Sequence, residues 1–93
     1  MESVLQQNKE CWVCHTTQNL ECHHIFFGTA NRKQSEKYGM KIWLCNAHHT
    51  GTNDSVHHNK DRDLFFKRYA QAWFEEHKGS REEFREIFGK SYL

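Results

Sequence analysis

Residues 21–26 read ECHHIF, residues 44–49 read LCNAHH, and residues 56–58 read VHH. All three histidine doublets and two of the four cysteines therefore fall between residues 22 and 58. Histidine is the commonest metal ligand in proteins and the usual base near neutral pH, and packing alone does not account for three such doublets. We interpret this stretch as a metal-binding region around which the rest of the chain is organised.

The length of 93 residues indicates one domain with a small core, of a size that a metal ion or disulfides commonly stabilise. The first residues lack the basic and apolar segments of a signal peptide, and no apolar run approaches the roughly 18 residues of a membrane span. We therefore expect a cytoplasmic protein without membrane contact. In that compartment, cysteines that accompany histidines hold zinc more often than they form disulfides.

Two half-sites predict a structural zinc ion. Residues 11–14 read CWVC and residues 45–48 read CNAH, and both spacings are typical of zinc ligands. A lone C-x-x-C is also compatible with a redox pair, but the second half-site favours zinc. The predicted ligands are Cys11, Cys14, Cys45 and His48. The remaining cysteine, Cys22, is interpreted as a small buried hydrophobic residue.

Two short apolar segments predict a pair of strands, over residues 20–27 and 40–44. The segment between them, residues 29–41, is polar and basic, with a helical turn expected at residues 35–38. Such a segment is either a solvated loop or a phosphate contact. Its position between the histidine doublets favours phosphate contacts, with Arg32 and Lys33 as the candidates.

Helices are predicted at both ends of the chain. A short polar helix is expected over residues 3–9, and the longest helix is expected from Asp61 to Lys78. The predicted apolar face of the longest helix consists of Phe65, Phe66, Tyr69, Ala72 and Trp73. Ser80 and Glu83 form a capping-box pattern for a last helix that ends at Phe88, so residues 61–88 supply two C-terminal helices and the class is α+β.

The order of these motifs resembles the HNH endonucleases, also called ββα-metal or His-Me finger nucleases. The usual zinc-containing pattern of that family is C-x-x-C, then Asp-His-Ile, then Leu-Cys-x-x-Cys-His. In this chain His23 replaces the Asp and His48 replaces the last Cys of the pattern. The resemblance covers roughly residues 11–58 and is strongest to small phage HNH proteins and phage RecA-dependent recombination nucleases.

The resemblance implies a small zinc-containing ββα-metal fold and a metal-dependent endonuclease that hydrolyses DNA phosphodiester bonds, leaving 5′-phosphate and 3′-hydroxyl ends. It places His24 as the general base and His23, His49 and His57 as ligands of one catalytic divalent cation. Asn53, four residues after His49, is the alternative third ligand. We prefer His57, because the glycine and turn residues after His49 favour a broken helix.

Two further expectations concern the neighbours of these residues. His58 is expected to be a solvent-facing neighbour of the ligand His57. The asparagine that orients the base in the family has no clear match, since the segment between the strands offers only Asn31. A backbone carbonyl is the expected substitute.

The cofactors expected are one structural Zn²⁺ and one catalytic cation, which is Mg²⁺, Mn²⁺, Ni²⁺ or Zn²⁺. Histidine ligands favour the transition metals over magnesium. The expected macromolecular partner is DNA, in the cytoplasm of a bacterial host if a phage encodes the chain. The net charge of only +1 does not indicate a strong autonomous DNA binder. A recombinase filament or phage packaging proteins that load the chain onto DNA would fit this charge, and so would a homodimer.

Two other classes of protein compete with the nuclease interpretation. A non-catalytic zinc module that binds DNA or protein would need the predicted zinc site and would treat the other histidines as surface residues. A histidine-rich metal-handling protein is less consistent with the ordered spacing and with the aromatic helices, which indicate a folded domain.

Overall fold

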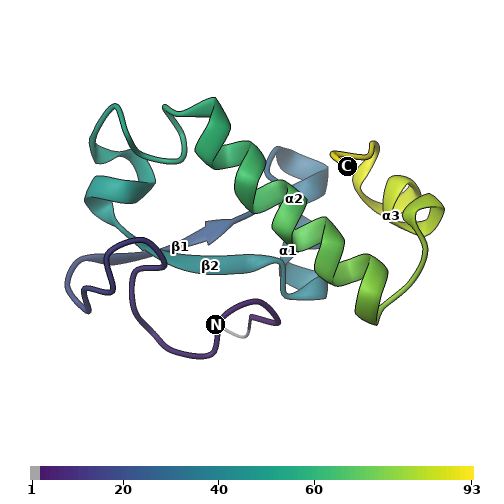
Figure 1. The fold of residues 1–93 in the computed structure, drawn as a ribbon, viewed down its shortest axis with the longest axis horizontal. Coiled ribbons are helices and arrows are strands. Elements are labelled where there is room, and N and C mark those ends of the chain that lie inside the picture. Colours follow the sequence, from purple (N-terminus) through teal and green to yellow (C-terminus); the bar gives the residue numbers. More distant parts are fainter. Residues whose placement is uncertain (1–2) are drawn as a thin grey trace.

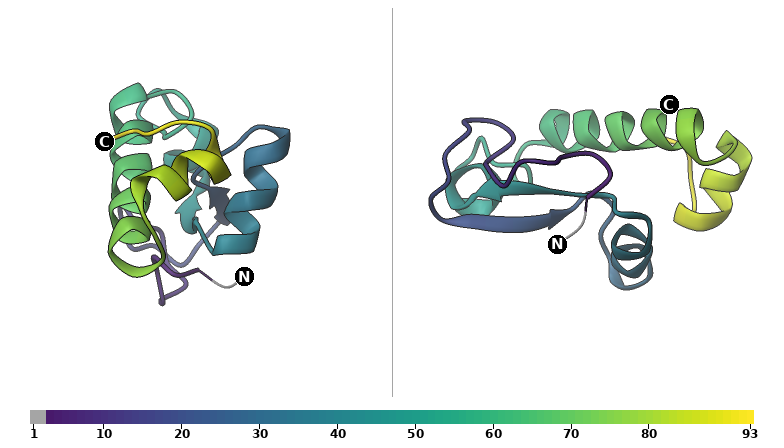
Figure 2. Two further views of the ribbon diagram at one scale, coloured as in Figure 1. Left: turned by 90° about the vertical axis from the view of Figure 1, so that its right-hand side faces the viewer. Right: turned by 90° about the horizontal axis from the view of Figure 1, so that it is seen from below.

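A computed structural model describes residues 3–93. Its elements are β1 (Leu20–His24), α1 (Thr29–Tyr38), β2 (Lys41–Cys45), the short π-helix η1 (Ala47–Gly51), α2 (Lys60–His77) and α3 (Arg81–Phe88). The two strands run along the long axis of the molecule, and α2 crosses over them (Figure 1). In both further views α1 and α2 lie on opposite sides of the strand pair (Figure 2). The two-stranded antiparallel sheet with helices confirms the expected α+β class.

The strand pair places the first histidine doublet. The antiparallel register runs from Leu20 opposite Cys45 to His24 opposite Lys41. β1 ends three residues earlier than predicted, since residues 25–26 leave the strand and enter the core. Successive strand residues point to opposite faces, so His23 is buried, with 1% exposed, whereas its neighbour His24 is half-buried. The two imidazoles therefore face different surroundings.

The connection between the strands is a ten-residue helix, α1, and not the loop with one helical turn that the sequence predicted. The prediction was wrong because α1 has almost no apolar face. It is held instead by polar contacts to the core. Ser35 is fully buried, and its hydroxyl accepts a hydrogen bond from the Phe26 N–H and donates to the Phe26 carbonyl. Gly39 ends the helix in the left-handed conformation, with φ of 70°.

The N-terminal segment covers the free edge of β2, and the helix predicted over residues 3–9 is absent. The Ser3 hydroxyl accepts hydrogen bonds from two backbone N–H groups, as a cap would, but no helix follows. Gln6 does not support a helix either, because its side-chain oxygen accepts a hydrogen bond from the Trp43 N–H of β2. The Trp12 N–H donates to the Trp43 carbonyl. These contacts satisfy strand-edge groups that would otherwise remain unpaired.

Both C-terminal helices form, but the bounds and the buried face of α2 differ from those predicted. Asn59 caps α2 by accepting from two backbone N–H groups, so the helix spans Lys60–His77 and not Asp61–Lys78 as predicted. Its buried apolar residues are Phe66, Ala70 and Phe74, whereas Phe65 and Tyr69 of the predicted face are exposed. α2 is 18 residues long but carries many charged side chains. No helix within residues 3–93 is long and apolar enough to cross a membrane.

The last helix forms as predicted. The Ser80 capping box begins α3, and Gly89 ends it in the left-handed conformation. Phe84 and Phe88 of α3 pack on Phe26, with ring centroids 5.3 and 4.4 Å apart. This aromatic cluster anchors the turn that follows the histidine doublet of β1.

Candidate metal centres

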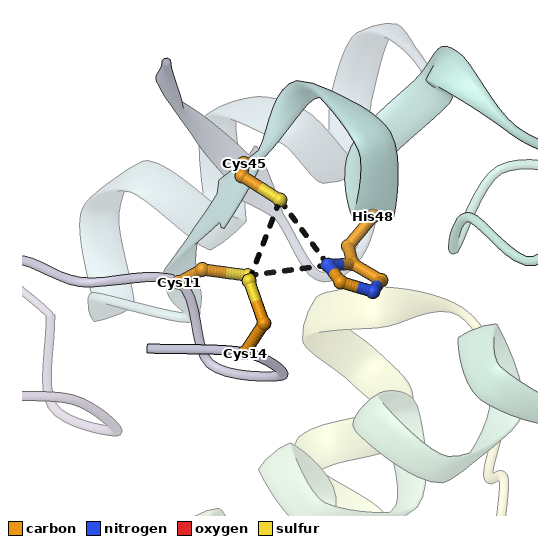
Figure 3. Close-up of side chains that lie close together, drawn as sticks. All are labelled: Cys11, Cys14, Cys45 and His48. Atoms are coloured by element: carbon orange, nitrogen blue, oxygen red, sulfur yellow. Dashed lines mark hydrogen bonds between the residues drawn. The ribbon is translucent and has the colours of Figure 1, made fainter. Parts of the chain in front are cut away.

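The four residues predicted to hold zinc lie together between the N-terminal turn and the end of β2 (Figure 3). The Cys14 and Cys45 sulfurs are 3.8 Å apart. The His48 Nδ1 atom lies 3.1 Å from the Cys45 sulfur and 3.7 Å from the Cys11 sulfur. All four ligand atoms lie within 4.8 Å of one another.

These distances fit a tetrahedral zinc ion and exclude a disulfide. With zinc–sulfur bonds of about 2.3 Å, two sulfurs of a tetrahedral site lie about 3.8 Å apart. A disulfide would need about 2.05 Å between the sulfurs. Three sulfurs and one imidazole nitrogen are also a donor set typical of structural zinc sites. The chain therefore has a Cys3His cluster suited to zinc.

The first half-site is a tight turn held by its own backbone. The His15 N–H donates to the Cys11 carbonyl, and the Cys11 N–H donates to the Thr16 carbonyl. His15 takes a positive φ of 63° to close this turn. Burial raises the pKa of Cys11, but hydrogen bonds from the backbone N–H groups of Cys14, Cys45 and Val13 more than offset this effect and lower the pKa to about 6. A thiolate, which is the form that binds metal, is thus favoured before any ion arrives.

A second cluster joins His23 of β1, His49 of η1 and His57 of the following loop. The Nε2 atoms of His49 and His57 are 3.1 Å apart, and the three ring centroids lie 4.7 to 5.2 Å from one another. Two imidazole nitrogens on one tetrahedral zinc ion lie about 3.3 Å apart, which is close to this separation. These are the three residues predicted to hold the catalytic cation.

His23 carries the strongest sign that the second cluster binds an ion. Its side chain is buried, yet its Nε2 atom has no hydrogen-bond partner. Burial, followed by the nearby His49 and His57, lowers the pKa of His23 to about 3. The imidazole is therefore neutral at physiological pH and offers a lone pair. A buried polar atom without a partner is costly, and a bound cation would satisfy it.

Glu21 orients His49. Its carboxylate lies 2.6 Å from Nδ1 of His49 and also accepts a hydrogen bond from the side-chain amide of Asn46. These hydrogen bonds, that from His49 first, lower the pKa of Glu21. Holding the proton on Nδ1 leaves Nε2 of His49 as the ligand atom, which is the common arrangement around metal-bound histidines.

Gly51 permits this arrangement by its lack of a side chain. A Cβ atom at this position would lie 2.6 Å from the side-chain oxygen of Asn46 and 2.9 Å from its carbonyl oxygen. The π-turn of η1 closes on Asn46, so a larger residue would push away the amide that supports Glu21. Sequence reasoning identified Gly51 as a helix breaker and did not identify this contact.

The predicted base, His24, lies beside the three-histidine cluster and is oriented by a carboxylate, not by the expected backbone carbonyl. Its Nε2 atom is 2.8 Å from Oε2 of Glu36, a residue of α1. The other carboxylate oxygen of Glu36 is 2.8 Å from Nζ of Lys41, whose side chain is 5% exposed. Hydrogen bonds from Lys41 and His24 lower the pKa of Glu36 to about 2. Glu36 thus remains an anion that fixes the proton of His24 on Nε2.

Two neighbouring cavities connect these residues to solvent. A cavity of about 200 Å³ is lined by the three clustered histidines, by His24 and by three further residues, Cys22, Phe27 and Arg32. A larger groove of about 870 Å³ shares Cys22, His24 and Arg32 with it and adds Lys33 and Lys41. Arg32 and Lys33, the predicted phosphate contacts, therefore lie in the groove that leads to the histidines.

The remaining sequence-based candidates lie elsewhere. Asn53 is exposed beyond the end of η1 and belongs to neither cluster, so the described structure favours His57 over it. Asn31 belongs to neither cluster, and its side-chain amide donates to the Phe88 carbonyl of α3. His58 is exposed, as expected. Cys22 is half-buried and lines both cavities, so its interpretation as a core residue was wrong.

Comparisons with known proteins give no relative. No family model matches the chain, and no match was found among curated proteins or among solved structures.

Proposed function

We propose that this chain is a metal-dependent DNA endonuclease of the HNH (ββα-metal) type, acting in phage DNA processing or recombination. One observation carries the proposal. A histidine held by a carboxylate, His24, opens into the same cavity as three histidines suited to a cation. That cavity adjoins a groove with two exposed basic residues. A base, a cation site and a phosphate-binding surface are the parts that phosphodiester hydrolysis needs.

In the proposed mechanism, His24 takes the proton from the attacking water. Glu36 accepts the Nε2–H of this imidazole, which leaves Nδ1 as the atom that receives the proton. Arg32 and Lys33 hold the phosphodiester in the groove through charged hydrogen bonds to its oxygens. A divalent cation bound by His23, His49 and His57 would supply charge stabilisation at the phosphoryl and leaving oxygens.

The Cys3His cluster has a separate, structural part in the proposal. Thiolates give zinc a closed coordination sphere without catalytic activity. His48 of this cluster and His49 of the other are consecutive residues of η1. Zinc would therefore tie the N-terminal turn to the π-turn that presents His49, and so position the catalytic ligand.

The test is cleavage of supercoiled plasmid and of labelled single-stranded, duplex and branched DNA, with Mg²⁺, Mn²⁺, Ni²⁺ or Zn²⁺. Exchanging His24→Ala should reduce the cleavage rate about 10²- to 10⁴-fold, the usual contribution of a general base. His77→Ala is the matched control, because His77 is an exposed histidine at the end of α2 that hydrogen-bonds to the Trp73 carbonyl and belongs to neither cluster, and it should cleave normally. Cleavage that persists in His24→Ala would refute the assignment of the base. DNA binding without cleavage under every metal would favour the non-catalytic zinc module.

A further inference from the structure

Phe27 is an exposed aromatic residue at the edge of the histidine cavity. The two residues before it, Ile25 and Phe26, are fully buried, whereas 43% of Phe27 is exposed. Among residues 3–93 the other large exposed hydrophobic side chains are Val4, Phe65, Tyr69 and Leu93, and none of these lines that cavity. Packing thus accounts for Ile25 and Phe26 but leaves the outward position of Phe27 unexplained.

The ring of Phe27 is held in place. Its centroid lies 5.3 Å from that of His57 and 6.3 Å from that of His23. The Nζ atom of Lys67 lies 4.4 Å from the ring centroid, and Lys67 is itself fixed by Asp63 at 2.8 Å. A ring fixed in advance loses little conformational freedom when it meets a ligand. The exposed ring is therefore an ordered surface next to the candidate cation site.

We propose that Phe27 is a stacking platform for one unpaired nucleobase adjacent to the phosphate that is cleaved, so that the substrate is single-stranded or locally unpaired DNA. This inference rests on the proposed nuclease function. Every base has a flat apolar face that stacks on an aromatic ring, whatever the sequence. Arg32 lines the same cavity as Phe27 and continues into the basic groove. A phosphate at Arg32 and a base on Phe27 thus belong to one continuous binding surface.

An unpaired base is favoured over a duplex for two reasons. In a duplex the faces of the bases are covered by their neighbours, and a side chain reaches them only after unstacking. The chain also lacks the large positive charge with which duplex binders follow two phosphate backbones, since its net charge is +1. One aromatic platform with a few basic residues suits a flexible single strand better.

The experiment measures binding separately from cleavage, in a His24→Ala background at a fixed salt concentration. The probes are a fluorescein-labelled 15-nucleotide single strand, the same sequence as a duplex, and a single strand that carries 2-aminopurine. Exchanging Phe27→Ala should weaken single-strand binding about 5- to 100-fold, which is the range for one base on one aromatic ring. Phe27→Trp should bind as the parent does. Phe65→Ala is the matched control, because Phe65 is 55% exposed on another face, and it should leave binding unchanged.

Three outcomes separate this inference from the proposed function. The platform is supported if Phe27→Ala alone binds the single strand more weakly, and if the parent and Phe27→Trp quench 2-aminopurine whereas Phe27→Ala does not. This result would support the platform even if the chain never cleaves DNA. Binding by Phe27→Ala within twofold of the parent would overturn the platform even if the parent cleaves DNA normally. An equal loss on single strand and duplex would also overturn it, because the ring would then act only by packing the site. Thermal melting of each variant identifies any loss that comes from unfolding.

Discussion

Exchanging Glu21→Gln should weaken metal binding at the three-histidine cluster about tenfold. Glutamine has the same shape as glutamate and can still accept the hydrogen bond from Nδ1 of His49, so the change removes the charge and little else. The pair is close, at 2.6 Å, which is typical of a charge-assisted hydrogen bond. Loss of a carboxylate behind a metal-bound histidine commonly weakens metal affinity 10- to 100-fold.

The lower end of that range applies to Glu21. Its side chain is 40% exposed, so water screens part of the interaction. A tenfold change in affinity corresponds to about 1.4 kcal/mol. The assay is calorimetric titration of Ni²⁺ or Zn²⁺ into protein that already holds one zinc ion per chain, so that only the second site is measured.

Glu10→Gln is the matched control for this measurement. Glu10 also pairs with a histidine, His15, at 2.9 Å, but belongs to neither metal cluster. It should leave the second-site affinity unchanged. If Glu21→Gln binds the second ion within twofold of the parent, or if Glu10→Gln loses as much affinity, Glu21 does not orient a ligand and the reasoning is refuted.

Three further predictions concern the structural zinc site, the general base and the stability of the protein at low pH. Cys11→Ser should lose the tightly held zinc and lower the melting temperature by more than about 10 °C, whereas Cys22→Ser should retain zinc. Metal analysis and calorimetry measure these effects, and an unchanged zinc content in Cys11→Ser would contradict the prediction. Glu36→Gln should lower the turnover number of DNA cleavage about 10- to 100-fold with unchanged KM, with partial recovery in Glu36→Asp, and equal rates would show that the base needs no carboxylate. In metal-free protein the unfolded chain binds a proton at His23 near pH 6.5, while the folded chain does so only near pH 3. The free energy of unfolding should therefore fall as the pH drops from about 6.5 towards 3, as measured by urea denaturation in chelator, and His23→Asn should flatten this dependence.

The residue pattern by itself predicted the parts of the fold and site that depend on residues close together in the chain. The grouping of distant residues, such as His23 with His49 and His57, was expected only from the family resemblance. Ligands three residues apart, as in C-x-x-C and C-x-x-H, need only a local turn, so their grouping follows from the chain itself. Strand alternation likewise separates His23 from His24 without knowledge of the rest of the molecule. The capping box at Ser80 is local too, and α3 begins there.

The parts that were missed depend on contacts between distant segments. Glu36 orients His24 only because α1 forms, and α1 is a polar helix that hydrophobic periodicity cannot reveal. Glu21 precedes the histidine doublet by two residues, yet its partner His49 comes from η1, 28 residues later. The buried face of α2 was predicted wrongly because several aromatic residues in one helix allow more than one apolar face. Packing of Phe74 on Phe84 of α3 and of Phe66 on Trp12 selects the face that is buried.

The adjacency of His48 and His49 has a consequence for how the protein would acquire its metals. Both residues lie on the five-residue turn η1, one facing the cysteines and the other facing His23 and His57. Zinc bound at the cysteine site would order that turn and hold His49 in place. The second ion would then bind more tightly, because less conformational entropy would be lost on binding. By thermodynamic reciprocity the second ion would raise the affinity for zinc by the same factor. The chain would then respond to two metal supplies jointly, and a shortage of zinc alone would leave the histidine cluster poorly loaded even where its own ion is abundant.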